Sequence, residues 1–178
     1  MQIGIAAHSS SVPRELERKA EVFVEKLAEC KKDIKLLLGG YWGLMKTVVD
    51  KAIQLKIPVI LFMPIEREDI PLPNEVIKIF TGCEFRCRSV MLVRSSDVLV
   101  SLGGGVGTEI ELLMAYAMGK PIYSLVNTGL STDLLRVSFP EYFDNRKVVK
   151  IRYFEDPIEM GKVICEKKIE EKVKADFG

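Results

Sequence analysis

Short apolar runs alternate along the chain with longer segments in which apolar residues recur at helical spacing. The apolar runs predict six strands, at residues 2–7, 34–38, 57–63, 97–102, 121–126 and 148–153. Helical spacing predicts helices at residues 14–30, 43–56, 85–95 and 107–118, and a last helix after Asp156. Because the apolar runs are continuous rather than alternating, they are typical of a parallel sheet buried on both faces. The order of elements predicts a three-layer α/β fold, a mostly parallel sheet with helices on both faces.

Three segments interrupt this alternation. Residues 63–74 are rich in proline and charge and predict a surface loop, residues 75–80 predict a short helix, and residues 127–146 are irregular or locally helical. No repeat or linker divides the chain, so we expect a single domain over residues 1–178. Ligands of parallel sheets bind beyond the carboxyl ends of the strands. The candidate loops are therefore those at residues 8–12, 39–43, 63–75 and 103–108.

Composition and charge narrow the class of protein. The chain has 26 Lys and Arg against 25 Asp and Glu, so bulk charge argues against nucleic acid as a partner. Hydrophobic residues make up 48%, which excludes disorder as a description of the whole chain. No apolar run approaches the roughly 20 residues of a membrane span, and the first residues lack a basic region. We expect a cytoplasmic protein, and the scarcity of Asn and Gln beside abundant Lys, Glu and Ile indicates a thermophilic source.

The cysteines and the single histidine restrict the chemistry. Nothing marks a secreted scaffold, so Cys30, Cys83, Cys87 and Cys165 are interpreted as free, buried or half-buried thiols rather than as two disulfides. A catalytic triad would have to use His8, and a multi-histidine metal site is impossible. We expect no metal and no resident cofactor.

A glycine-rich loop between a predicted strand and a predicted helix carries the densest signal. It runs Gly103-Gly104-Gly105-Val106-Gly107-Thr108. Free N–H groups at a helix start, together with the helix dipole, favour an anion, most simply a phosphate. The loop lacks the Gly-Lys-Ser/Thr ending of a P-loop and is not a GxGxxG dinucleotide motif. We therefore predict a phosphate site at residues 104–108; the alternative is a turn that only packs strand on helix.

A second glycine turn should lie at the same edge of the sheet. Its sequence is Gly39-Gly40-Tyr41-Trp42-Gly43. Gly39 and Gly40 are candidate binding residues, and a tight turn without ligand is an equal alternative. Two roles are open for Tyr41 and Trp42: one of them faces the base of a nucleotide, or they only cover the core.

The helix after the glycine loop joins a carboxylate to an apolar surface. Glu111 lies about one turn into it, and residues 112–118 carry no charge. A helix that is apolar on every side must be buried on every side. We therefore infer a homodimer contact through helix 106–118; the alternative is coverage by the C-terminal helix. Arg86, Arg88 and Arg94 precede the loop and are candidates for phosphate contacts.

These residues resemble the LOG (LONELY GUY) proteins and the wider lysine-decarboxylase-like superfamily. The resemblance is carried by Arg88, Arg94 and Asp97, by Gly104-Gly105-Val106-Gly107-Thr108 with Glu111, by the turn at residues 39–45, and by Ser9 and Ser10. The superfamily also includes molybdenum-cofactor carrier proteins and the DNA-processing protein A. The resemblance covers about residues 1–126 and implies a Rossmann-like homodimer.

The resemblance also implies an activity. The best-studied relatives hydrolyse the N-glycosidic bond of AMP or cytokinin riboside 5'-monophosphates, releasing the base and ribose 5-phosphate. Arg88 and Glu111 align with their essential arginine and glutamate, and Ser9, Ser10, Gly39, Gly40 and residues 104–108 with their ligand site. Glu111 would activate water and stabilise an oxocarbenium-like centre, while Arg88 would position substrate.

Three departures point to the carrier-type branch instead. Gly103 replaces the signature proline, Ser89 stands where many LOG proteins have lysine, and Ile110 interrupts their pair of glutamates. The alternative function is therefore a non-catalytic nucleotide or molybdenum-cofactor binder. In both cases the expected partner is a small phosphate-bearing ligand, not a membrane or a nucleic acid.

Overall fold

A single parallel sheet organises the computed structural model, which describes residues 1–166. Seven strands follow the order β4-β3-β2-β1-β5-β6-β7, and every neighbouring pair is parallel. The strands are β1 (Gln2–Ala6), β2 (Lys35–Leu38), β3 (Val59–Met63), β4 (Ile77–Phe80), β5 (Val98–Ser101), β6 (Ile122–Leu125) and β7 (Ile151–Phe154). The predicted α/β fold is confirmed. Residues 167–178 of the predicted domain lie outside the described residues.

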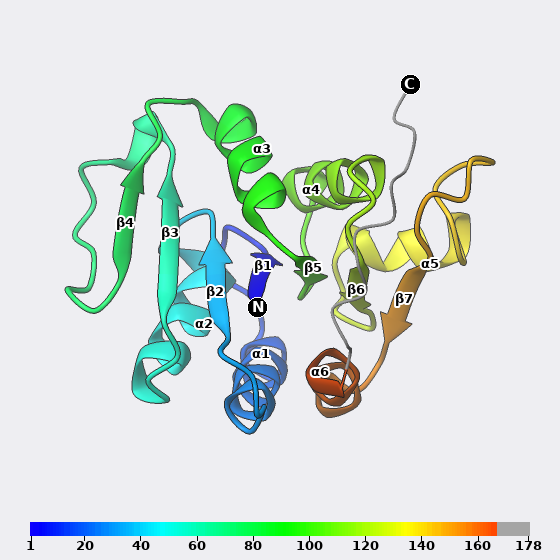
Figure 1. Cartoon of the computed structure of the whole chain (residues 1–178), viewed down its shortest axis with the longest axis horizontal. Helices are drawn as coiled ribbons and strands as arrows, with labels where there is room; N and C mark the ends of the chain where they lie inside the picture. The colour runs from blue at the N-terminus through cyan, green and yellow to red at the C-terminus, as the bar shows by residue number, and fades with distance from the viewer. Residues whose placement is uncertain (167–178) are drawn as a thin grey trace.

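Helices cover both faces of the sheet (Figure 1). One layer contains α1 (Arg14–Ala28), α2 (Gly43–Gln54) and α6 (Pro157–Glu166); the other contains α3 (Phe85–Ser95), α4 (Val106–Ala117) and α5 (Leu134–Ser138). Short 3-10 turns, η1 (Ile65–Arg67) and η2 (Ser131–Asp133), complete the described part. Each layer has its own apolar core against the sheet. None of the helices in residues 1–166 has the length and apolar character needed to cross a bilayer.

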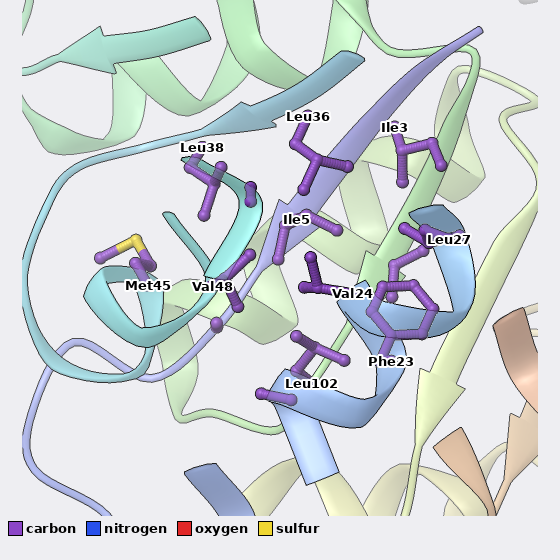
Figure 2. Packing of buried hydrophobic residues seen from close by; sticks show 14 of the residues in the cluster. Ile3, Ile5, Phe23, Val24, Leu27, Leu36, Leu38, Met45, Val48 and Leu102 are labelled. Atoms are coloured by element: carbon purple, nitrogen blue, oxygen red, sulfur yellow. The ribbon is translucent and has the colours of Figure 1, made fainter. Parts of the chain in front are cut away.

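The core beneath α1 and α2 shows why the strands read as continuous apolar runs. Ile3 and Ile5 of β1 and Leu36 of β2 point toward Phe23 and Val24 of α1 (Figure 2). All of these side chains are almost completely buried. Alternate strand residues serve the opposite core, as Leu37 and Leu99 do beneath α3 and α4. Both faces of each central strand are therefore apolar.

The strand order reverses beside β1, which pairs with β2 on one side and β5 on the other. A reversal of this kind leaves a crevice at the carboxyl ends of the two strands. The segment after β1 and the glycine loop after β5 meet at this point. The fold thus brings residues 8–10 and 105–111 to one place.

One predicted element is wrong. Residues 75–80 were expected to form a helix, whereas Ile77–Phe80 forms β4, paired in parallel with β3. The β-branched residues Val76, Ile77 and Ile79 favour an extended strand, and β3 offers a free edge. All four residues of β4 are exposed, so no burial pattern marked the strand in the sequence.

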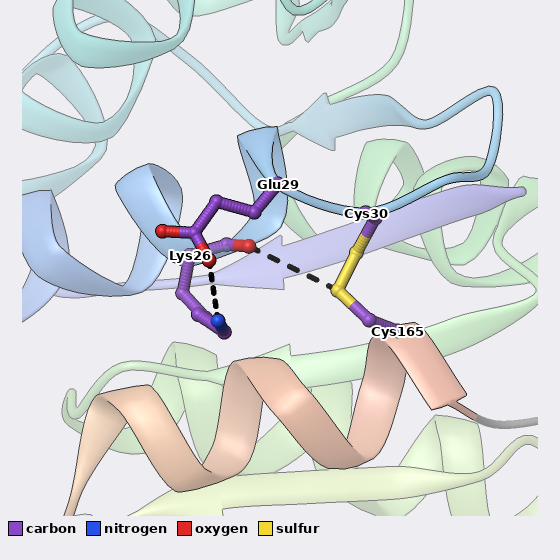
Figure 3. Close-up of a disulfide and its surroundings, with 4 residues drawn as sticks. All are labelled: Lys26, Glu29, Cys30 and Cys165. Atoms are coloured by element: carbon purple, nitrogen blue, oxygen red, sulfur yellow. Dashed lines mark hydrogen bonds and ion pairs between the residues drawn. A yellow bond between two sulfur atoms is a disulfide. The ribbon is translucent and has the colours of Figure 1, made fainter.

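The cysteine prediction is also wrong in part. Cys30, just after α1, forms a disulfide with Cys165 of α6, with a Cα–Cα distance of 5.3 Å (Figure 3). The bond joins positions 135 residues apart, which only the packing of α6 on α1 brings together. Cys83 and Cys87 are free; Cys83 is half-buried as expected, but Cys87 is exposed.

Candidate functional site

A cavity of about 610 Å³ lies at the carboxyl ends of β1 and β5. Four segments line it: residues 7–10 after β1, the start of α2, the first turns of α3, and residues 105–108, 110 and 111 at the start of α4. Arg67 of η1 completes the wall. Of the predicted site residues, the structure places Ser9, Ser10, Arg88, Glu111 and residues 105–108 on the cavity surface. It does not place Gly39, Gly40 or Gly104 there.

The start of α4 presents backbone N–H groups to this cavity. Gly105 is the N-cap residue and has no side chain to accept from the first turn. The N–H groups of Val106, Gly107 and Thr108 therefore have no acceptor within the helix, and all three residues line the cavity. Such a helix start favours an anion. The geometry supports a phosphate position at residues 106–108.

Gly104 has a supporting position behind the cavity. Its N–H donates to Thr132 Oγ1 at 3.0 Å, and its carbonyl accepts from the Thr132 N–H at 3.2 Å, with Ser131 Oγ 3.2 Å from the same carbonyl oxygen. Because these bonds use both of its backbone groups, Gly104 holds the glycine loop against η2. A Cβ at this position would lie 2.0 Å from Thr108 Oγ1. The glycine therefore allows Thr108 to pack against the loop.

Sequence reasoning missed the residues that hold the loop from this side. Asp133 accepts from the N–H groups of Thr128 and Gly129 and from the Thr128 hydroxyl, at 2.8–2.9 Å. These bonds shape residues 128–133 so that Ser131 and Thr132 reach Gly104. The Ser-Thr-Asp sequence was the only signal, because such side chains commonly bond nearby backbone in turns.

The cavity floor contains a buried pair of opposite charges. Arg88 and Glu111 are 6% and 7% exposed, and Arg88 Nη1 lies 3.5 Å from Glu111 Oε1. Nε of Arg88 is buried and has no hydrogen-bond partner among the described residues. Glu111 Oε2 has no hydrogen bond to any described residue. The protein alone thus leaves this pair incompletely satisfied.

Ser89 bonds the same carboxyl group. Its Oγ lies 2.7 Å from Glu111 Oε1 and 3.0 Å from the carbonyl oxygen of Phe85. A serine hydroxyl has one proton and donates to one of the two. When the Ser89 hydroxyl donates to the Phe85 carbonyl, its oxygen can accept a hydrogen bond from a protonated Glu111 carboxyl. Ser89 can therefore accommodate both protonation states of Glu111.

Burial controls the titration of the pair. It raises the pKa of the Glu111 carboxyl above the usual value, outweighing the attraction of Arg88 and the hydrogen bond from Ser89. Burial also lowers the pKa of the Arg88 guanidinium, against the attraction of Glu111. A carboxyl group with a raised pKa in a cavity is suited to proton transfer.

The second glycine turn makes room for two neighbouring side chains, and its predicted ligand contact stays a prediction. A Cβ on Gly39 would lie 1.4 Å from Arg88 Nη1, and one on Gly40 would lie 2.2 Å from the Trp42 ring. Gly39 thereby allows Arg88 to reach Glu111. Tyr41 donates to Asp50 at 2.6 Å and is not part of the cavity wall.

Trp42 forms an aromatic wall with Phe85. Their rings meet edge to face with centroids 6.3 Å apart, and both side chains line the cavity. The Arg67 guanidinium lies 5.8 Å from the Trp42 ring centroid. Flat aromatic and guanidinium surfaces are suited to contact with a planar ring. The cavity thus combines the unpaired N–H groups of a helix start with an aromatic wall.

The remaining candidates have structural contacts. Asp97 accepts from the Gln2 N–H at 2.8 Å, and Glu109 accepts from Ser131 at 2.8 Å. Arg94 is exposed and does not line the cavity, whereas Arg86 does. Within residues 1–166, no group of three His, Cys, Asp or Glu side chains is arranged to hold a metal ion.

Comparison with known proteins identifies the family. A profile described as the SLOG cluster4 family matches residues 1–167. An uncharacterized protein of Archaeoglobus fulgidus is 34% identical over 125 residues, covering 70% of this chain and 80% of its own. The solved structure of the protein TM1055 is 33% identical with a TM-score of 0.80, covering 92% of this chain and 97% of its own. The molybdenum cofactor binding protein of Rippkaea orientalis is 25% identical with a TM-score of 0.70, covering 92% and 96%. The superfamily predicted from the glycine loop is confirmed, and the chain belongs to the SLOG cluster4 family.

Proposed function

We propose that the cavity binds a nucleoside 5'-monophosphate and that the protein hydrolyses its N-glycosidic bond. The observation that carries this proposal is Glu111: a buried carboxyl group, with a raised pKa and one unbonded oxygen, in the same cavity as the free N–H groups of α4. A phosphate at residues 106–108 anchors the ligand, and the ribose then lies toward Glu111. The aromatic wall of Trp42 and Phe85 receives the base.

Glu111 and Arg88 have different roles in the proposed hydrolysis. Ionised Glu111 accepts a proton from water and opposes the positive charge that develops on the ribose. Arg88 holds Glu111 in place and remains protonated, so it positions groups rather than transferring protons. The bond from the base nitrogen to C1' breaks, water adds at C1', and the products are the free base and ribose 5-phosphate. His8 lines the cavity and is one candidate to protonate the departing base.

A specific observation also favours a second function, carriage of an intact ligand. Oε1 of Glu111 is bonded to Ser89, a residue that departs from the LOG pattern. The Rippkaea orientalis protein, with 25% identity, is described as binding the molybdenum cofactor. In this second function the same anion position and aromatic wall hold a phosphate-bearing ring compound that is not cleaved.

Incubation with AMP distinguishes the two functions. We expect wild-type protein to release adenine and ribose 5-phosphate, measured by chromatography, and Glu111→Gln to be slower by about 10²–10⁴-fold, the usual contribution of a general base. Glu109→Gln is the matched control, because Glu109 lies in the same helix but bonds Ser131 outside the cavity. No release above the Glu111→Gln background refutes hydrolysis. AMP or molybdenum cofactor that raises the melting temperature without release supports carriage.

We further propose that two copies of the chain associate through α4. Val106 and Leu113 are 69% and 48% exposed on α4, and Val90 and Met91 are exposed on the adjacent α3. The described part of α6 packs on α1, on the opposite face of the sheet, and does not cover this surface (Figure 1). An exposed apolar surface of this kind is typical of a subunit interface. A second copy would cover it beside the cavity mouth, where Val106 lies.

A further inference from the structure

Cys83 and Cys87 form a close thiol pair that the proposed reaction does not use. Their Sγ atoms lie 2.7 Å apart. A disulfide bond is about 2.0 Å long, so the two sulfurs lie only about 0.7 Å farther apart than bonded sulfurs. Cys83 immediately precedes Glu84, the N-cap residue of α3, and Cys87 lies in the first turn of that helix. The start of α3 therefore holds both sulfurs close together.

Small solutes can reach this thiol pair, unlike a thiol that is buried in the hydrophobic core. Cys87 is exposed and Cys83 is half-buried, so a small solute reaches Cys87 first. The hydrogen bond with Cys87, in which Cys83 keeps its proton, raises the pKa of the Cys83 thiol, and burial and nearby Glu84 add to the effect. Cys87 is therefore the thiol better placed to attack, and Cys83 the one placed to resolve.

The pair also lies on the rim of the cavity. Phe85 and Arg86, between the two cysteines, line it. The Cys83 carbonyl accepts from the Ile65 N–H at 2.9 Å, which ties the pair to the turn that carries Arg67. A bond between the two sulfurs would fix the backbone that presents these cavity residues.

We propose that Cys83 and Cys87 are a reversible dithiol–disulfide site that exchanges with small-molecule disulfides at the cavity rim. The Cys87 thiolate attacks one sulfur of the disulfide R–S–S–R, forming a mixed disulfide and releasing one thiolate. Cys83 then attacks the Cys87 sulfur, forming the protein disulfide and releasing the second thiolate. The protein loses two electrons and two protons, and R–S–S–R is reduced to two thiols, so the exchange balances.

Trypsin provides a direct readout, because it cleaves after Arg86 and separates the two cysteines. The full chain, incubated with oxidised glutathione, is alkylated, digested and analysed by mass spectrometry. We expect peptide 79–86 linked to peptide 87–88, with the intact protein lighter by two hydrogen atoms. The linkage should disappear on return to reduced glutathione.

Single variants test the order of the steps. Cys83→Ser should keep glutathione on Cys87, because no second thiol resolves it, whereas wild type should carry no glutathione. Cys87→Ser should react more slowly, because the half-buried Cys83 then attacks alone. The Cys30→Ser, Cys165→Ser double variant is the control and should still form the linkage. Two results would overturn the proposal. One is wild-type protein that keeps glutathione on both cysteine peptides. The other is wild-type protein with both thiols still alkylated under conditions in which Cys83→Ser reacts with glutathione.

Discussion

Replacing Gly39 with alanine is predicted to displace Arg88 from the cavity floor. The added Cβ would lie 1.4 Å from Nη1 and 2.3 Å from Cζ of Arg88, so the guanidinium has to move away. The φ angle of Gly39 is outside the left-handed region, so alanine itself costs the backbone little. The substitution therefore acts through Arg88, whose guanidinium must leave its position 3.5 Å from Glu111.

The magnitude follows from the burial of the pair. Removing one partner of a buried ion pair typically costs about 3–5 kcal/mol, and displacing Arg88 likewise leaves Glu111 without its partner. Glu111 can escape part of this cost by taking up a proton, because its pKa is already raised. We therefore expect a loss near the lower limit, about 3 kcal/mol, which for a chain of this length corresponds to a fall in melting temperature of about 6–12 °C.

Calorimetric unfolding of four proteins isolates the mechanism. Wild type, Gly39→Ala, Arg88→Ala and the double variant form a cycle in which Gly39→Ala should cost less than about 1 kcal/mol once Arg88 is absent. Gly105→Ala is the matched control, because a Cβ there has no atom within 4 Å. An equal loss from Gly39→Ala in both backgrounds would refute the reasoning, since the cost would then not pass through Arg88.

Three further predictions concern the cavity, the disulfide and the apolar surface. Because Glu111 acts as an ionised base and its pKa is raised, adenine release from AMP should increase as pH rises through a value above the usual carboxyl range; a rate that is flat there contradicts this role. Cys165→Ser removes a cross-link between positions 135 residues apart and should lower the free energy of unfolding by about 5 kcal/mol through chain entropy. The urea midpoint should fall, and an unchanged midpoint would contradict this prediction. Leu113→Glu should convert a dimer to a monomer in light scattering, with exposed Lys150→Glu as the control; a dimer retained in Leu113→Glu argues for another interface.

Local signals in the sequence predicted much of the fold and the centre of the site. The continuous apolar runs predicted all of the central strands, because each is buried on both faces. Gly105 to Thr108 and Glu111 were predicted as site residues from the glycine loop between strand and helix, and the structure places them on the cavity surface. The strand β4 was missed because its four residues are exposed and carry no burial pattern.

Other features depended on contacts between distant segments. The closeness of Gly39 to Arg88 was not predicted, because it joins the end of β2 to α3. The bonds from Thr132 to Gly104 and the disulfide of Cys30 with Cys165 likewise join segments far apart in the chain. Periodicity and spacing report local structure and carry no information on such pairs.

A crystal structure of the Glu111→Gln variant with AMP tests the central claim most directly. The account predicts the phosphate on the N–H groups of residues 106–108, the base against Trp42, and C1' of the ribose within reach of residue 111. A phosphate bound elsewhere, or AMP bound with its ribose turned away from residue 111, would contradict it.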